Sequence, residues 1–138
     1  MNKKYSYRIK AVHSSLETAL DPVLEALEEL NVDHKVCFKI RLALEEALVN
    51  VVSYAYDDDN GEVEIRYEIS DDPCMLIITI IDEGRPFNPL EAEDPLLSSD
   101  INQRKIGGLG LYIIKNTMDE VEYHRENNQN ILIIKKNF

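Results

Sequence analysis

The chain has 138 residues, of which 44% are hydrophobic and 30% charged, and this composition is typical of one globular domain, here residues 1–138, with its own core. Its formal net charge of −11 argues against direct nucleic-acid binding, because phosphate contacts need clustered lysine and arginine. The basic first residues precede no apolar run, and the longest apolar run, residues 75–81, is too short to span a bilayer. We therefore expect a cytoplasmic protein that does not enter the membrane.

The first half of the chain predicts one strand and two helices. Residues 5–11 alternate between apolar and polar side chains, which is a strand pattern. Asp21 as the cap and Pro22 at the first helical position give the start signal of a helix. Asp33 is the expected cap of a longer helix that runs to about Tyr56. The first helix should bury a stripe of leucines: Leu20, Leu24, Leu27 and Leu30.

The second half predicts most of a sheet. Residues 62–70 alternate as a strand with one wet face, and residues 74–82 are apolar enough for a central strand. A long loop without a period covers 83–106, and residues 109–121 are again helical. Residues 121–126 and 131–136 close the chain as a hairpin around 127–130. The sum is an α/β two-layer sandwich, a sheet covered on one face by helices.

Glu46 and Asn50 are the first candidate site residues. They are four apart and therefore share one face of the long helix. A carboxylate and an amide oxygen that converge suit Mg²⁺, and the carboxylate could alternatively act as a base. On its own, the pair is read more simply as a solvated glutamate and a tolerated asparagine.

Asp82 and Gly84 follow the predicted central strand. Polar residues at the end of such a strand often form a binding site, and a buried carboxylate needs a donor such as the exocyclic amine of a purine. Gly84 would let the backbone approach a flat ring. The simpler reading is a strand that ends in a turn.

Three glycines, Gly107, Gly108 and Gly110, precede or open the last predicted helix. Free N–H groups at a helix N-terminus bind phosphate, and Arg104 and Lys105 add positive charge beside them. The stretch is neither a P-loop nor a dinucleotide fingerprint. A flexible hinge before the helix is the alternative.

The order of these three stretches resembles the nucleotide-binding boxes of the GHKL (histidine kinase-like) ATPase superfamily. More closely, "EEALVNVVSYAY", "IDEGRPFNP" and "GGLGLYIIKNTMDEVEY" are similar to the small anti-sigma factor serine/threonine kinases. The resemblance covers nearly the whole chain. It implies the Bergerat ATP-binding fold, a mixed sheet with helices on one face.

The resemblance also implies catalytic and metal-binding roles. Asn50 would hold the Mg²⁺ that bridges the phosphates of ATP, and Glu46 would be the general base for the attacking hydroxyl. Phosphoryl transfer depends mainly on positioning and charge neutralisation, which in this acidic chain would fall on Mg²⁺ and on Arg104 or Lys105.

The remaining implied roles concern the base and the phosphates. Asp82 would accept a hydrogen bond from the adenine amine, with Gly84 beside the ring. Gly108 and Gly110 would present amides to the phosphates, and residues 91–106 would form a lid over ATP.

Three functions follow in order of preference. The first is an ATP-dependent kinase that phosphorylates serine on a small anti-sigma-antagonist protein of the STAS type. The second is a nucleotide-dependent binding module that sequesters a sigma factor or other regulator without phosphate transfer. The third, a histidine-kinase catalytic domain, is disfavoured because no dimerisation helix with a phospho-acceptor histidine precedes the domain. The family's habit predicts a homodimer.

The boxes depart from the family pattern at a few positions. Val49 precedes Asn50, Ser53 and Tyr54 replace a frequent polar-histidine pair, and the last strand lacks a frequent threonine. These departures leave the catalytic and metal residues in place and bear on the choice of partner.

Overall fold

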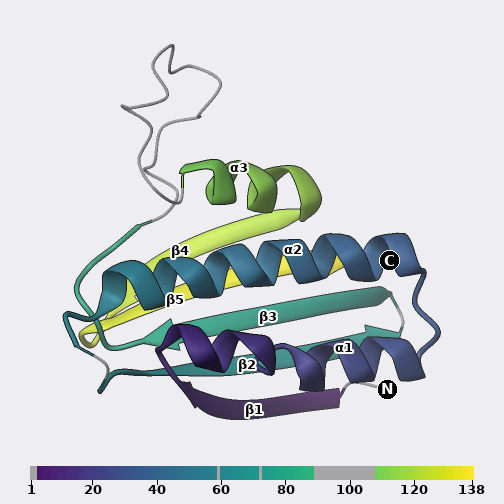
Figure 1. The fold of residues 1–138 in the computed structure, drawn as a ribbon. Helices are drawn as coiled ribbons and strands as arrows, with labels where there is room; N and C mark the ends of the chain where they lie inside the picture. The colour runs from purple at the N-terminus through teal and green to yellow at the C-terminus, as the bar shows by residue number, and fades with distance from the viewer. Residues whose placement is uncertain (1–2, 59, 72, 89–107) are drawn as a thin grey trace.

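One antiparallel sheet carries a layer of helices on one face (Figure 1). The computed structural model describes residues 3–58, 60–71, 73–88 and 108–138. Within these residues no helix is long and apolar enough to cross a membrane. The elements run in the order β1 (Lys3–Lys10), a 3-10 helix (His13–Glu17), α1 (Asp21–Glu29), α2 (His34–Asn50), a π-helical turn (Val51–Ala55), β2 (Glu62–Asp71), β3 (Cys74–Asp82), α3 (Gly108–Thr117), β4 (Glu120–Glu126) and β5 (Gln129–Asn137).

α2 begins where the sequence predicts, and α1 begins one residue earlier than predicted, with Asp21 as its first helical residue and not its cap. Pro22 lies in the first turn of α1, and the side chain of Asp33 caps α2 by accepting from the backbone N–H of Lys35 at 2.8 Å. The buried stripe of α1 differs from the expected one in part. Leu27 is fully buried, but Leu30 is exposed and Val23 takes a core position, because Val23 lies four residues before Leu27 on the same face.

The long helix changes its winding before it ends. It is α-helical only to Asn50, and residues 51–55 form a π-helical turn instead of continuing to Tyr56 as an α-helix. The backbone carbonyl of Ala55 then accepts from the N–H of Arg85 at 2.8 Å. The end of the helix is thereby joined to the loop that follows β3.

The sheet has the order β1-β2-β3-β5-β4, and each neighbouring pair is antiparallel. The expected two-layer fold is confirmed, but the expectation of a mixed sheet is wrong for the described strands. Asn127 and Asn128 both have positive φ, 50° and 62°, as a two-residue hairpin turn requires. This turn pairs β4 with β5, and β5 also pairs with β3, so β3 and β4 run parallel to each other without being neighbours.

The last helix is shorter than predicted. α3 ends at Thr117, and the N–H of Asp119 already bonds to the carbonyl of Lys135 on β5 at 2.9 Å. Residues 120 and 121 therefore belong to β4. Pairing with β5 therefore decides the structure of residues whose apolar spacing alone would also fit a helix.

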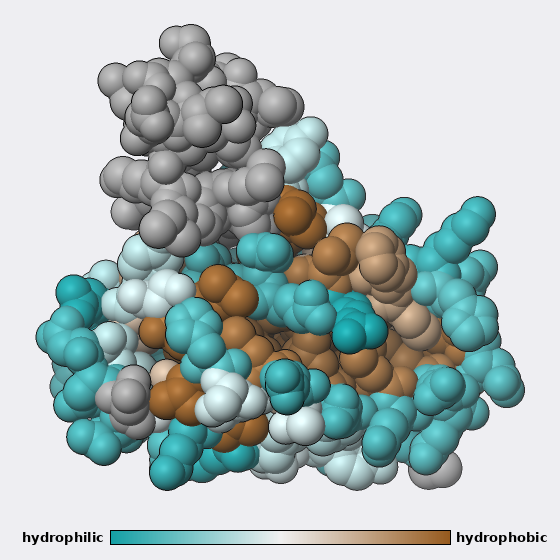
Figure 2. Space-filling view, in the orientation of Figure 1, coloured by the Kyte–Doolittle hydropathy of each residue, from teal (hydrophilic) through white to brown (hydrophobic). Residues whose placement is uncertain are grey.

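The core lies between the sheet and the helices. α2 lies over the central strands, with α1 and α3 on either side of it (Figure 1). The largest fully buried side chains of the core are Val23, Leu27, Ile40, Leu44, Leu48, Val63, Ile65, Leu76, Ile78, Ile80, Ile114 and Ile134. Figure 2 shows apolar surface between the hydrophilic side chains on this helical face. Among the described residues, Phe38 on α2 is the most exposed large apolar side chain, with 60% of its surface accessible.

Candidate functional site

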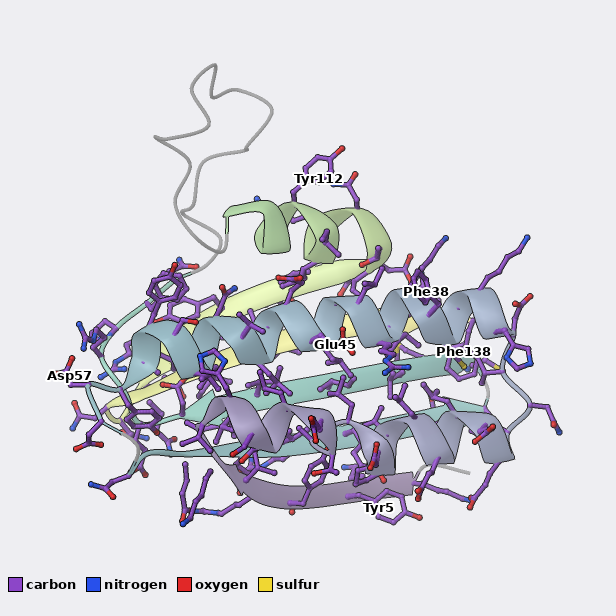
Figure 3. The ribbon with its side chains drawn as sticks, viewed as in Figure 1. Tyr5, Phe38, Glu45, Asp57, Tyr112 and Phe138 are labelled. Carbon is purple, nitrogen blue, oxygen red and sulfur yellow. The ribbon has the colours of Figure 1, made fainter. Side chains whose placement is uncertain are left out.

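A small cavity lies where the C-terminal end of α2 meets β3 and β5. Asp57, which follows the π-helical turn, lies at this end of the molecule, and Phe138 lies at the opposite end (Figure 3). The cavity has a volume of about 30 Å³. Most of the lining is apolar, but three of the lining side chains are buried and polar: Asn50, Asp82 and Asn130. The other lining residues are Ala47, Val51, Ala55, Ile80, Phe87, Tyr123 and Leu132.

Asp82 ends the central strand as a buried carboxylate. It is 5% exposed, and its Oδ1 accepts from the N–H of Gly84 at 2.9 Å and from Nδ2 of Asn130 at 2.8 Å. Burial raises the pKa of Asp82, while these two hydrogen bonds and the charge of Arg125 act in the opposite direction. No hydrogen bond from a described residue reaches Oδ2, so this oxygen is available to a ligand.

Gly84 is required by the approach of the helix end. A Cβ at this position would lie 2.1 Å from the backbone oxygen of Ala55, which no side chain tolerates. Its own carbonyl accepts from Nη1 of Arg125 at 2.8 Å. The structure thus gives the glycine a packing reason, in addition to the predicted approach of a flat ring.

Asn130 is a buried polar residue that sequence reasoning missed. It lies opposite Asp82 in the β3–β5 register, and its Nδ2 also donates to the carbonyl of Arg85 at 2.8 Å. Its Oδ1 accepts from the N–H of Phe87 at 3.3 Å and from the hydroxyl of Tyr123. The signal was the period of two that places residues 130, 132 and 134 on one face of the strand.

Asn50 brings a second amide to the cavity. It is the last residue of α2 and is 5% exposed, yet its Oδ1 accepts no hydrogen bond from the described residues. A buried acceptor left unpaired costs about 1–3 kcal/mol. This oxygen is therefore the atom in the cavity that most clearly lacks a partner of its own.

Glu46 lies one turn before Asn50 on the same helix. It is half-buried and does not line the cavity within the described residues. Its neighbour Glu45 has an ion-pair partner among the described residues, because its carboxylate accepts from Nε of Arg41 at 3.0 Å. Of the two adjacent glutamates, Glu46 therefore lies on the same helix face as Asn50, and Glu45 is committed to an ion pair.

An aromatic pair closes one side of the site. Phe87 lines the cavity and stacks on Tyr54, with ring centroids 5.0 Å apart and an interplanar angle of 19°. The hydroxyl of Tyr56 accepts from the N–H of Glu83 at 2.8 Å and donates to the carbonyl of Glu62 at 2.6 Å. The loop 83–88 is therefore attached to both the helix end and the sheet.

The predicted phosphate-binding residues are placed in part. Gly108 opens α3 and Gly110 lies in its first turn, as the sequence predicts. Arg104, Lys105 and Gly107 lie outside the described residues, as does the predicted lid 91–106.

The residues present fit the groups of a nucleotide. The cavity offers apolar walls for a flat base, a carboxylate oxygen for an amine donor, and an unpaired amide oxygen of the kind that Mg²⁺ accepts.

Comparison with known proteins agrees with this chemistry. The profile of a family described as the histidine kinase-like ATPase domain matches residues 9–136. The chain belongs to this family. The expected resemblance to the GHKL superfamily is thereby confirmed, and membership of an ATPase family makes ATP the expected cofactor.

Curated relatives of this histidine kinase-like ATPase domain are serine-protein kinases. The chain is 34% identical to serine-protein kinase RsbW of Bacillus subtilis over 101 residues, which are 70% of this chain and 62% of the relative. It is 30% identical to serine-protein kinase RsbW of Bacillus pumilus over 121 residues, 83% of this chain and 67% of the relative. The chain thus spans about three fifths of the length of the Bacillus subtilis relative. The resemblance to the anti-sigma factor kinase branch is confirmed.

A solved structure shows the same fold. The RsbU and RsbW domains of a Mycobacterium tuberculosis protein match 97% of this chain and 32% of theirs, with a TM-score of 0.69 and 16% identity. At this identity the likeness speaks for the fold alone.

Proposed function

We propose that this domain is an ATP- and Mg²⁺-dependent serine/threonine protein kinase that phosphorylates a small anti-sigma-antagonist protein of the STAS type and thereby switches partner binding. The unpaired buried Oδ1 of Asn50, in one cavity with the Asp82 carboxylate, is the observation that carries the proposal. The serine-protein kinase activity named for the relatives supports the class of reaction. The proposed second partner is a sigma factor, and we expect a cytoplasmic homodimer.

The base and the metal would be held by residues of the cavity. Asp82 would accept from the adenine amine through Oδ2, and Asn50 would hold Mg²⁺ through Oδ1. Mg²⁺, when bound, supplies neutralisation of the phosphate charge. The apolar walls exclude water from the base.

The phosphates and the acceptor hydroxyl would be held by the other predicted residues. The N–H groups at the start of α3, near Gly108 and Gly110, would bind phosphate oxygens, with Arg104 and Lys105 as cations beside them. Glu46 would accept the proton of the attacking serine hydroxyl as general base. The γ-phosphoryl group of ATP would then be transferred to that oxygen, with ADP as the leaving group.

A second candidate is a nucleotide-dependent binding module that sequesters a regulator without transferring phosphate. The position of Glu46, outside the lining of the cavity, is the observation that favours it. In that function ATP would shape the partner surface and no proton acceptor would be needed.

Capture of the partner separates the two candidates. The tagged protein is incubated in native lysate with and without ATP and Mg²⁺, and bound proteins are identified and tested for transfer of labelled γ-phosphate. The kinase proposal predicts a nucleotide-dependent partner that becomes labelled on serine. Nucleotide-dependent capture without labelling would favour the binding module, and absence of ATP binding would contradict both.

A further inference from the structure

We propose that Asn130 is a positioning residue that fixes the free oxygen of Asp82 and the 83–88 loop, and so makes the cavity selective for purines with a 6-amino group. The inference deepens the proposed nucleotide-binding function and rests on it. Asn130 does not belong to any of the three motifs, and it acts through Asp82, without itself being assigned a contact to the base.

The orientation of the Asn130 amide is set by two backbone groups. The carbonyl of Arg85 can only accept, so it must face Nδ2, and the N–H of Phe87 can only donate, so it must face Oδ1. A flipped amide would lose both hydrogen bonds. The hydroxyl of Tyr123 fills the second acceptor position of Oδ1. The remaining proton of Nδ2 is therefore committed to Asp82.

This commitment decides which oxygen of Asp82 serves a ligand. Oδ1 already accepts from Nδ2 of Asn130 and from the N–H of Gly84, and no described donor reaches Oδ2. A buried carboxylate oxygen is an acceptor with no proton of its own. This oxygen can accept a hydrogen bond from the amino group of adenine. The 6-oxo group of inosine or guanine is itself an acceptor, so it would face the carboxylate oxygen without a hydrogen bond.

The charged and titratable groups around Asp82 are compatible with an ionised carboxylate. Arg125 on β4 donates to the carbonyl of Gly84 and contributes an attractive charge. Tyr56 lies behind the strand end, with its hydroxyl bonded to the N–H of Glu83. Glu83 itself is exposed.

The same amide also holds the loop that carries the aromatic wall. Asn130 bonds to the backbone of both Arg85 and Phe87, and Phe87 stacks on Tyr54 beside the cavity. The carboxylate and the wall are therefore placed by one residue. A change at Asn130 should alter the choice of base, and not only the strength of binding.

Calorimetric titration of the full chain with ATP and with inosine triphosphate tests the inference. The wild type should bind ATP about 10- to 100-fold more tightly, the span of a hydrogen bond to a charged group. Asn130→Asp keeps the shape but replaces the Nδ2 donors by oxygen, so this ratio should fall at least about tenfold, and ATP affinity should be lost at a higher pH than in the wild type. Asn128→Asp makes the same chemical change in the exposed hairpin turn and should leave the ratio unchanged.

Tyr123→Phe supplies a milder variant if Asn130→Asp does not fold. It removes only the hydroxyl that Asn130 accepts from, and the ratio should fall about two- to fivefold, less than one decade. The inference would be overturned if the folded variants kept the wild-type ratio of ATP affinity to inosine triphosphate affinity. It would also be overturned if the wild type bound the two nucleotides equally. Either result would leave the proposed function intact. A wild type that binds neither nucleotide would overturn the proposed function and, with it, the selection of a base.

Discussion

The two buried asparagines of the site differ in how their side chains are satisfied. Asn130 on β5 donates two hydrogen bonds and accepts two, all within the sheet and the 83–88 loop. Asn50 at the end of α2 is equally buried, at 5% exposed, yet its Oδ1 accepts none from the described residues. Both amides line the same cavity.

This contrast separates residues that serve the fold from residues that await a ligand. A folded chain normally pairs its buried polar groups, and each exception needs a reason. The hydrogen bonds of Asn130 stabilise the strand end, whereas the lone oxygen of Asn50 costs stability without a bound group. The same substitution at the two positions should therefore have opposite effects on the free energy of unfolding.

The largest expected effect concerns the glutamate one turn from Asn50. Glu46→Gln keeps the shape of the side chain but cannot accept a proton, so phosphate transfer to the captured partner should fall about 10²–10⁴-fold. Calorimetry should show nearly normal ATP binding, because the acceptor hydroxyl is absent from the ATP complex. Glu45→Gln is the matched control, since Glu45 is committed to Arg41. Transfer by Glu46→Gln at the wild-type rate would contradict the base assignment.

Replacement of the satisfied amide should destabilise the protein. Asn130→Leu is similar in size but leaves the carbonyl of Arg85 and the N–H of Phe87 without partners, which should lower the free energy of unfolding by about 2–4 kcal/mol. Urea denaturation measures this. Asn137→Leu, on the exposed end of the same strand, should change it by less than about 0.5 kcal/mol. Equal effects of the two variants would show that the network does not stabilise the fold.

Loss of the carboxylate should weaken ATP binding. Asp82→Asn replaces the acceptor oxygen for the adenine amine, and ATP affinity should fall by about 1.5–3 kcal/mol, the value of a hydrogen bond to a charged group. Calorimetry checks this at neutral pH. Unchanged affinity would place the base elsewhere.

The pH dependence sharpens this test. Burial raises the pKa of Asp82, and adenine needs the ionised carboxylate, so wild-type ATP affinity should fall as the pH is lowered through that raised pKa. The free energy of unfolding should change with pH in the opposite direction. The stabilising contribution of Asp82 is fully present below its pKa in the unfolded chain, about 3.9, and is lost as the pH rises through its raised pKa in the folded protein. Asp82→Asn should remove both dependences, as calorimetry and urea denaturation across this acid range would show.

The smallest expected effect is a gain. Asn50→Leu removes the buried oxygen that has no partner, and in the absence of nucleotide it should raise the free energy of unfolding by about 1–2 kcal/mol. Thermal or urea denaturation measures the change. A destabilised variant would mean that the amide of Asn50 contributes to the fold.

Local chemistry accounts for the part of this fold that the sequence predicted. The cap at Asp33 and the bounds of β3 depend on neighbouring residues and on an apolar period, and the structure confirms both. The carboxylate of Asp82 was expected at the end of a central strand and lies there. Asn50 was singled out because an amide within an apolar helix face needs a reason, and its buried unpaired oxygen agrees with that reasoning.

The remaining features depend on pairings between distant segments. The antiparallel order of the sheet follows from where β5 inserts, which no local pattern states. Asn130 appeared to belong to a polar loop, and its register opposite Asp82 shows that it belongs to β5. The π-helical turn ends at Ala55, which lies against Gly84 from a segment about thirty residues further along the chain. The predicted roles of the site residues stay predictions.

Calorimetric titration of the wild type and Asn50→Leu with ATP, each with and without Mg²⁺, tests the central claim most directly. The account predicts that Mg²⁺ strengthens ATP binding to the wild type and that this strengthening is lost in Asn50→Leu, although the variant is at least as stable as the wild type. A folded Asn50→Leu protein that keeps the full Mg²⁺-dependent gain in ATP affinity would contradict the assignment of the unpaired oxygen to the metal.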